Sequence, residues 1–167
     1  MTPLPAGPAP WWKGARGEWF VVGQVALMAL VFVGPRRWSG WPATDLPFAG
    51  ARPFLGAGLF LIGGALFLAG VIRLGPNLTP LPRPKDHATF VDTGAYSLVR
   101  HPLYSGGLLL AFGWALWIGS WLTLGYVALL LAFLDLKSRR EERWLQEKFT
   151  GYAQYQRRVR RLVPFLY

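Results

Sequence analysis

The hydrophobic residues of this chain are concentrated in three stretches that carry no charged side chain, over residues 19–34, 54–72 and 102–134. A bilayer hydrocarbon core of about 30 Å is crossed by about 20 helical residues, so the second stretch suits one crossing and the first is slightly short. The third stretch has 33 residues. As one helix it would be about 50 Å long, which is too long for one crossing. The segment Gly119-Ser120-Trp121 near its middle is typical of a turn between two helical arms.

This pattern predicts an all-α integral membrane protein with about four transmembrane helices, the last two forming a helical hairpin. We expect the spans over residues 19–34, 54–73, 102–118 and 121–136. A Pro-rich leader over residues 1–18 precedes a single membrane domain over 19–167. Within that domain, the loop 74–101 and the tail 137–167 lie outside the spans. Apolar residues at a spacing of 3–4 in the tail predict an amphipathic C-terminal helix.

The charges set the expected topology. The chain has 18 Lys and Arg against 8 Asp and Glu. Of these 18 cations, 15 fall in the leader, in residues 73–102 or in residues 135–167, and an even number of crossings places all three on one side. The positive-inside rule then puts both termini in the cytoplasm, with the chain in the inner membrane and the bilayer as its partner. This explains the net charge of +10 without nucleic acid. A secretory signal peptide at residues 13–34 is a minor alternative.

The composition excludes several kinds of site. The chain is 53% hydrophobic and only 16% charged, which is unusual for a soluble domain. It has no Cys, which rules out disulfides, iron–sulfur clusters and thiol nucleophiles, and only two His, so we expect no metal centre. Gln24 is the one strongly polar side chain inside the spans, whereas transporters and proton relays need ionisable groups there.

The polar chemistry should therefore lie at the cytoplasmic edge, in two clusters. One covers residues 96–104 and opens the hairpin; the other covers residues 137–142 and follows its second arm. An antiparallel hairpin returns its second arm beside the start of the first, so we expect the two clusters to face each other. The first brings imidazole, phenol and guanidinium groups, and the second brings two carboxylates and further cations.

Each feature also has a purely structural interpretation. Tyr96 and Tyr104 suit an aromatic belt, and Arg100-His101 could mark the lipid headgroup level. Glu141-Glu142 could be a solvated, salt-bridged face. The glycines of the second span are typical of a close-packing helix surface, and the arginines of residues 157–161 of attraction to anionic lipid.

Taken together and in order, the motifs resemble the isoprenylcysteine carboxyl methyltransferase family and its bacterial relatives, including phospholipid methyltransferases. The resemblance covers about half of the chain, from Pro80 onwards. It is carried by Thr93-Gly94-Ala95-Tyr96, the run Arg100-His101-Pro102-Leu103-Tyr104-Ser105-Gly106, the pair Glu141-Glu142, and the tail residues Phe149, Tyr152, Tyr155, Arg158, Val159 and Pro164. The Arg-His-Pro-x-Tyr-x-Gly motif with the Glu-Glu pair is specific for this superfamily but not for a substrate.

The resemblance implies a methyltransferase that uses S-adenosylmethionine (SAM) at the cytoplasmic edge. By position, the implied cofactor-binding residues are Ala88, Thr89, Phe90, Val91, Tyr96, His101, Pro102, Leu103, Tyr104, Glu141 and Glu142. The implied catalytic residues are Arg100, His101, Glu141 and Glu142, and the implied substrate-binding residues are Lys137 and Arg140. SAM carries an ammonium, a sulfonium and a carboxylate, which suits this mixture of carboxylates and cations.

Methyl transfer is an in-line displacement that needs alignment and water exclusion more than a protein nucleophile. The expected acceptor is a lipid or another lipophilic molecule, either a carboxylate or a headgroup amine. Two alternatives stay open. One is an NADPH-dependent reductase similar to sterol reductases, which share the hairpin motif and end like Val163-Pro164-Phe165-Leu166-Tyr167. The other is a non-catalytic membrane anchor or assembly protein.

Overall fold

A computed structural model describes residues 14, 16–37, 39 and 46–163 of the chain. No strand occurs among these residues, although Val99 and Arg160 form one isolated parallel bridge. The predicted leader lies mostly outside the described residues, as do residues 164–167. The helices in chain order are α1 (Glu18–Val33), α2 (Arg52–Leu74), the short 3-10 helix η2 (Gly75–Asn77), α3 (Ala95–Leu98), α4 (Pro102–Ile118), α5 (Trp121–Lys148) and α6 (Tyr152–Arg158).

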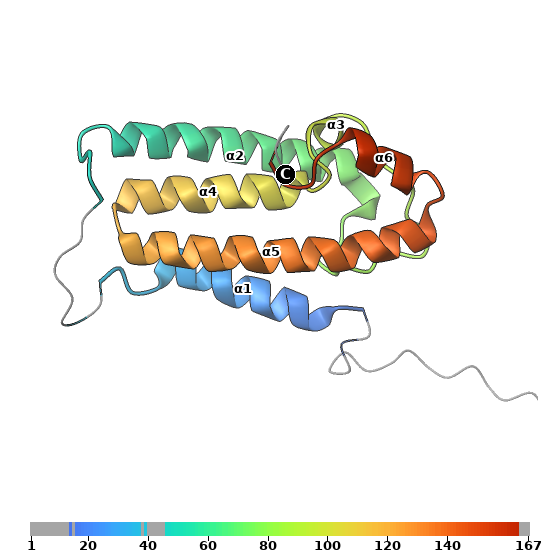
Figure 1. Ribbon diagram of the computed structural model, residues 1–167, viewed down its shortest axis with the longest axis horizontal. Coiled ribbons are helices and arrows are strands. Elements are labelled where there is room, and N and C mark those ends of the chain that lie inside the picture. The colour runs from blue at the N-terminus through green and yellow to red at the C-terminus, as the bar shows by residue number, and fades with distance from the viewer. Residues whose placement is uncertain (1–13, 15, 38, 40–45, 164–167) are drawn as a thin grey trace, which may run out of the picture.

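The four long helices α1, α2, α4 and α5 lie side by side and run alternately in opposite directions (Figure 1). α2 packs along α4, while α4 and α1 both pack against α5. A core of buried side chains that includes Val31, Ala111 and Leu130 lies where α1, α4 and α5 meet. The antiparallel order brings the start of α1, the end of α2, the start of α4 and the second half of α5 to one end of the bundle.

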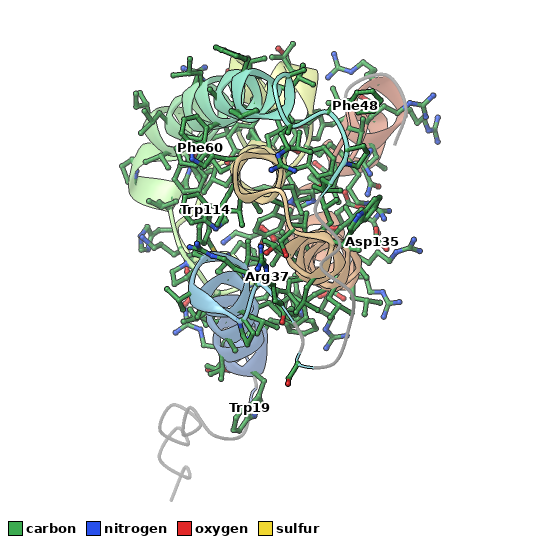
Figure 2. The ribbon with its side chains drawn as sticks, turned by 90° about the vertical axis from the view of Figure 1, so that its left-hand side faces the viewer. Trp19, Arg37, Phe48, Phe60, Trp114 and Asp135 are labelled. Carbon is green, nitrogen blue, oxygen red and sulfur yellow. The ribbon has the colours of Figure 1, made fainter. Side chains whose placement is uncertain are left out.

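The outer surface of the bundle is apolar. The segments Arg52–Asn77 and Trp121–Lys148 are long and apolar enough to cross a membrane, and α1 and α4 are apolar but shorter. In the view along the bundle, Phe60 and Trp19 point outward (Figure 2). Phe54 on α2 is 80% exposed. Apolar surface of this extent marks contact with lipid or protein rather than with water.

α4 and α5 form the helical hairpin that the sequence predicts. Pro102 lies in the first turn of α4, where its missing N–H removes no helical hydrogen bond. α4 ends at Gly119, whose φ of 73° is left-handed and suits glycine. Ser120 then caps α5, because its hydroxyl accepts a hydrogen bond from the backbone N–H of Thr123 at 3.2 Å.

The second arm of the hairpin differs from the prediction in its length. α5 continues to Lys148, well past the predicted end of the span at residue 136. The apolar run ends near residue 136, but residues 137–148 contain neither Gly nor Pro and are mostly strong helix formers. The chain leaves the helix only at Phe149–Gly151, and the short α6 follows. The predicted tail helix is therefore two pieces, the polar second half of α5 and α6.

Glycines hold α2 directly against α4. A Cβ atom placed on Gly63 would lie 2.8 Å from the carbonyl oxygen of Gly106, and one placed on Gly106 would lie 2.7 Å from that of Gly63. Gly56 and Gly113 oppose each other in the same way, at 2.6 Å in both directions. The backbones therefore touch where the glycines face each other. Gly56 and Gly63 form the close-packing surface that the sequence favours, whereas Gly58 meets no neighbour.

Candidate functional site

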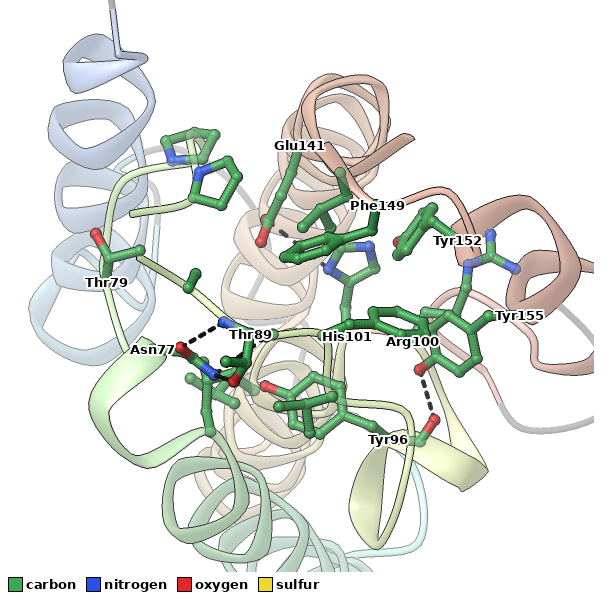
Figure 3. Close-up of a pocket in the computed structure, with 18 of the residues that line it drawn as sticks. Asn77, Thr79, Thr89, Tyr96, Arg100, His101, Glu141, Phe149, Tyr152 and Tyr155 are labelled. Atoms are coloured by element: carbon green, nitrogen blue, oxygen red, sulfur yellow. Dashed lines mark hydrogen bonds and ion pairs between the residues drawn. The ribbon is translucent and has the colours of Figure 1, made fainter. Parts of the chain in front are cut away.

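A pocket lies at the end of the bundle where α2 ends and α4 begins. It encloses about 800 Å³ of space, including its open mouth. The loop that follows η2, the start of α4, the second half of α5 and the segment 149–155 supply its walls (Figure 3). Its polar lining residues are Asn77, Thr79, Thr89, Tyr96, Arg100, His101, Tyr104, Glu141, Tyr152 and Tyr155.

One wall is the loop segment Ala88–Val91, which Asn77 holds in place. The Asn77 side-chain amide donates to the carbonyl oxygen and hydroxyl of Thr89 at 3.2 and 3.1 Å. The Asn77 side-chain oxygen accepts from the Thr89 N–H at 3.1 Å. Lys148, at the end of α5, donates to the carbonyl oxygens of Lys85 and Asp86. The loop is therefore fixed from both η2 and α5, although it has no regular structure of its own.

The opposite wall joins the two polar clusters of the sequence. The Tyr104 hydroxyl donates to Oε2 of Glu141 at 2.7 Å. The His101 ring stacks on the Tyr104 ring with centroids 5.3 Å apart and planes within 3°. Nδ1 of His101 lies 3.8 Å from the same carboxylate. The hairpin thus brings the clusters together as expected, and Glu141 presents a carboxylate at the pocket wall.

The neighbouring carboxylate of Glu142 is buried and does not line the pocket. Its Oε1 accepts from Nε of Arg100 at 2.7 Å and lies 3.2 Å from Nε2 of His101. Its Oε2 accepts from Gln156 at 3.1 Å and from Arg161 at 3.3 Å. Glu142 therefore joins the start of α4 to the C-terminal segment, whereas Glu141 faces the pocket.

The C-terminal segment closes the remaining side of the pocket. The backbone N–H groups of Arg100 and His101 donate to the carbonyl oxygens of Arg160 and Arg161 at 2.8 and 3.1 Å. The Tyr155 hydroxyl donates to the carbonyl oxygen of Tyr96 at 2.6 Å. Burial raises the pKa of Tyr155 above the ordinary tyrosine value, so the hydroxyl stays neutral and keeps its donor proton.

Aromatic rings make this side of the pocket apolar. The Phe90 ring lies 5.5 Å from the Phe149 ring, 6.0 Å from that of Tyr152 and 5.5 Å from that of Tyr155. These rings come from the loop and from the segment after α5, which meet only in the folded chain. Such a cluster can stack against a planar ring and attract a cation at its faces.

The structure brings most of the residues predicted for the site to one place. Those that line the pocket are Ala88, Thr89, Phe90, Val91, Tyr96, Arg100, His101, Leu103, Tyr104 and Glu141. Pro102, Glu142, Lys137 and Arg140 do not. Lys137 is buried, and its ammonium donates to Gln24 at 2.5 Å and to the carbonyl oxygen of Pro80 at 3.1 Å. Arg140 is exposed and lies over the Trp144 ring.

Sequence reasoning did not assign several residues that line the pocket. Asn77 and Thr79 precede the resembling part of the chain, and a lone Asn after a span carries no signal. Phe149, Tyr152 and Tyr155 belong to the tail residues that carry the family resemblance, and that resemblance was the signal that could have found them. It does not show which way their rings point.

No group of His, Asp and Glu side chains in the described part of the chain is arranged to hold a metal ion. A family model described as phospholipid methyltransferase matches residues 51–151, which is more than half of the chain. The match begins just before α2 and ends just before α6. It therefore includes the hairpin, the loop segment 88–91 and both glutamates, but not α1. The chain belongs to the phospholipid methyltransferase family, a family of membrane-embedded methyltransferases.

Proposed function

We propose that this protein is a SAM-dependent methyltransferase whose pocket binds SAM and whose acceptor is a lipid. The observation that carries the proposal is the place of Glu141, a carboxylate held by Tyr104 at the wall of a pocket that is otherwise largely aromatic and apolar. A pocket of this kind suits a ligand with a planar base at one end and an ammonium at the other.

The residues present fit SAM on chemical grounds. Phe90, Phe149 and Tyr152 offer ring faces for the adenine and for the sulfonium cation. Glu141 offers a charge-assisted hydrogen bond to the ammonium. The backbone of Ala88–Val91 offers polar groups beside these side chains. When bound, SAM supplies an activated methyl group on a positively charged sulfur.

The contribution of the chain is then binding, orientation and exclusion of water. No protein nucleophile is needed, because the acceptor attacks the methyl carbon directly. A carboxylate acceptor also needs no base. An amine acceptor must first lose a proton, and Glu141 and His101 are the groups at the pocket that can take it. Glu142 acts through Arg100 and His101, whose side chains it holds.

The family description points to a phospholipid as the acceptor. A lipid fits the apolar outer surface, since it can approach the pocket from the bilayer without entering water. We propose Arg140 as a contact for the lipid headgroup, because its guanidinium is exposed beside the pocket end of α5. Lys137, held by Gln24 and Pro80, positions the loop and Tyr104 rather than contacting the lipid. The family match does not favour the reductase or the anchor.

Titration of the purified protein with SAM, S-adenosylhomocysteine and NADPH tests the cofactor. We expect saturable binding of the first two, and a 10- to 100-fold weaker affinity for both in Glu141→Gln. The loss corresponds to one charge-assisted hydrogen bond, worth about 1.5–3 kcal/mol. Glu147→Gln, on the exposed side of the same helix, is the matched control and should bind as the wild type does. Binding of NADPH alone, or an unchanged affinity in Glu141→Gln, would contradict the proposal.

We also propose four crossings of the inner membrane, with both termini and the pocket on the cytoplasmic side. The native chain has no Cys, so single cysteines report the topology directly. Ser39 is an exposed residue between α1 and α2, and Ser39→Cys should react with an impermeant thiol reagent added outside intact cells. Gln154→Cys, exposed on α6, should react only after lysis. The reverse pattern would overturn the topology.

A further inference from the structure

Among the described residues that line the pocket, Tyr152 is the one with a buried side-chain polar atom that has no hydrogen-bond partner. Tyr152 is 3% exposed, and its hydroxyl oxygen is buried with no hydrogen-bond partner among the described residues. Its side chain reaches from α6 toward Phe149 and His101 at the pocket wall (Figure 3). A buried hydroxyl without a partner is unfavourable in a folded protein. A ligand group that pairs with it would therefore gain binding affinity.

Tyr155, one helical turn later, shows that this is a property of the position and not of buried tyrosines in α6. It is 2% exposed, and its hydroxyl donates to the carbonyl oxygen of Tyr96. The two tyrosines therefore share a helix, a pocket and a degree of burial, but only one of them has its hydroxyl paired within the protein.

The surroundings of Tyr152 indicate the kind of group that it meets. Burial raises its pKa, and the carboxylates of Glu142 and Glu141 raise it further. The Arg100 guanidinium acts on the pKa of Tyr152 in the opposite direction. The hydroxyl is therefore a neutral donor that lies near a guanidinium as well as the two carboxylates, and an anionic oxygen is its strongest partner. The neighbouring side chains of Tyr104 and Arg100 have protein partners already, since Tyr104 donates to Glu141 and Arg100 donates to Glu142.

We infer that Tyr152 is a cofactor-binding residue whose hydroxyl donates a hydrogen bond to the α-carboxylate of the methionyl end of SAM. The inference rests on the proposed function and extends it. In SAM the ammonium and the carboxylate are bonded to the same carbon. If Glu141 holds the ammonium, the carboxylate lies within a few ångströms of it, at the end of the pocket where the Tyr152 hydroxyl is buried.

Comparison of two ligands on two proteins tests the inference. SAM and decarboxylated SAM, which keeps the ammonium and lacks the carboxylate, are titrated into the wild type and into Tyr152→Phe. We expect the affinity of Tyr152→Phe for SAM to be lower by about tenfold or more, because the variant loses a hydrogen bond to a charged group. Decarboxylated SAM should bind both proteins equally.

Thermal unfolding of the unliganded proteins supplies the control. Tyr155→Phe should lower the unfolding temperature, because it removes the bond to Tyr96, whereas Tyr152→Phe should leave it unchanged or raise it. Three results would each overturn the inference while the proposed function stands. In Tyr152→Phe, the affinity for both ligands could fall equally, or the affinity for SAM could stay unchanged. The third is an unfolding temperature of Tyr152→Phe as low as that of Tyr155→Phe. A wild type that binds neither ligand would overturn both.

Discussion

Glu142→Gln should lower the free energy of unfolding by about 3–5 kcal/mol, the usual cost of removing one partner of a buried ion pair. The Glu142 carboxylate is 4% exposed and is contacted by Arg100, His101 and Arg161. The glutamine side chain has the same shape, but it carries no charge and offers one oxygen in place of two. The Arg100 guanidinium would then be buried without its compensating carboxylate, while Arg161 would keep its pair with Asp135.

The effect should spread to the C-terminal segment, because the same groups hold it in place. Arg100 donates through its Nη1 to the carbonyl oxygens of Gln156 and Val159, and Arg161 also pairs with Asp135. In Glu142→Gln we expect amide hydrogen exchange to become faster than in the wild type, with a larger increase over residues 152–162 than over α4. Glu147→Gln is an exposed change of the same type on the same helix. It should change the free energy of unfolding by no more than about 0.5 kcal/mol and leave the exchange rates as in the wild type. Stability and exchange like those of the wild type would show that Glu142 does not anchor the segment.

The two adjacent glutamates illustrate what the sequence predicts and what it does not. The charge-free stretches, the Gly119 turn and Pro102 locate the helices, because spans and helix ends depend on local residue types. The hairpin then brings residues 96–104 and 137–142 together by topology alone. Which of Glu141 and Glu142 faces the pocket is not local information. It depends on how a helix that continues to Lys148 is rotated against α4 and against the C-terminal segment.

The same limit explains the pocket residues that were missed. Asn77 acts only because the loop returns to it twelve residues later, with Thr89 as its partner. Tyr152 and Tyr155 are placed by the bonds of Arg100 and His101 to residues 160 and 161, across about 60 positions of sequence. Lys137, predicted as a substrate contact, is paired with Gln24 on α1, which lies outside the part of the chain that the family model matches.

Gly63→Leu should have the second large effect, a loss of at least about 3 kcal/mol in the free energy of unfolding. A Cβ on Gly63 would lie 2.7 Å from Leu109 Cβ, 2.8 Å from the carbonyl oxygen of Gly106 and 2.8 Å from the backbone N of Leu110. Two of these atoms belong to the backbone of α4, so no side-chain rotation can relieve the contact. The only response is for α2 and α4 to separate along the interface that their glycines form.

Gly58→Leu is the matched control on the same helix, because a Cβ placed on Gly58 would meet nothing within 4 Å. Both variants gain the higher helix propensity of leucine over glycine, so any difference between them reports the α2–α4 contact. We expect the control to unfold at or above the wild-type temperature and Gly63→Leu well below it. The damage should also reach the pocket, since α4 carries His101 and Tyr104 at the end of the same interface and α2 leads into Asn77. If the two variants are equally stable, the glycine contact does not set the distance between α2 and α4.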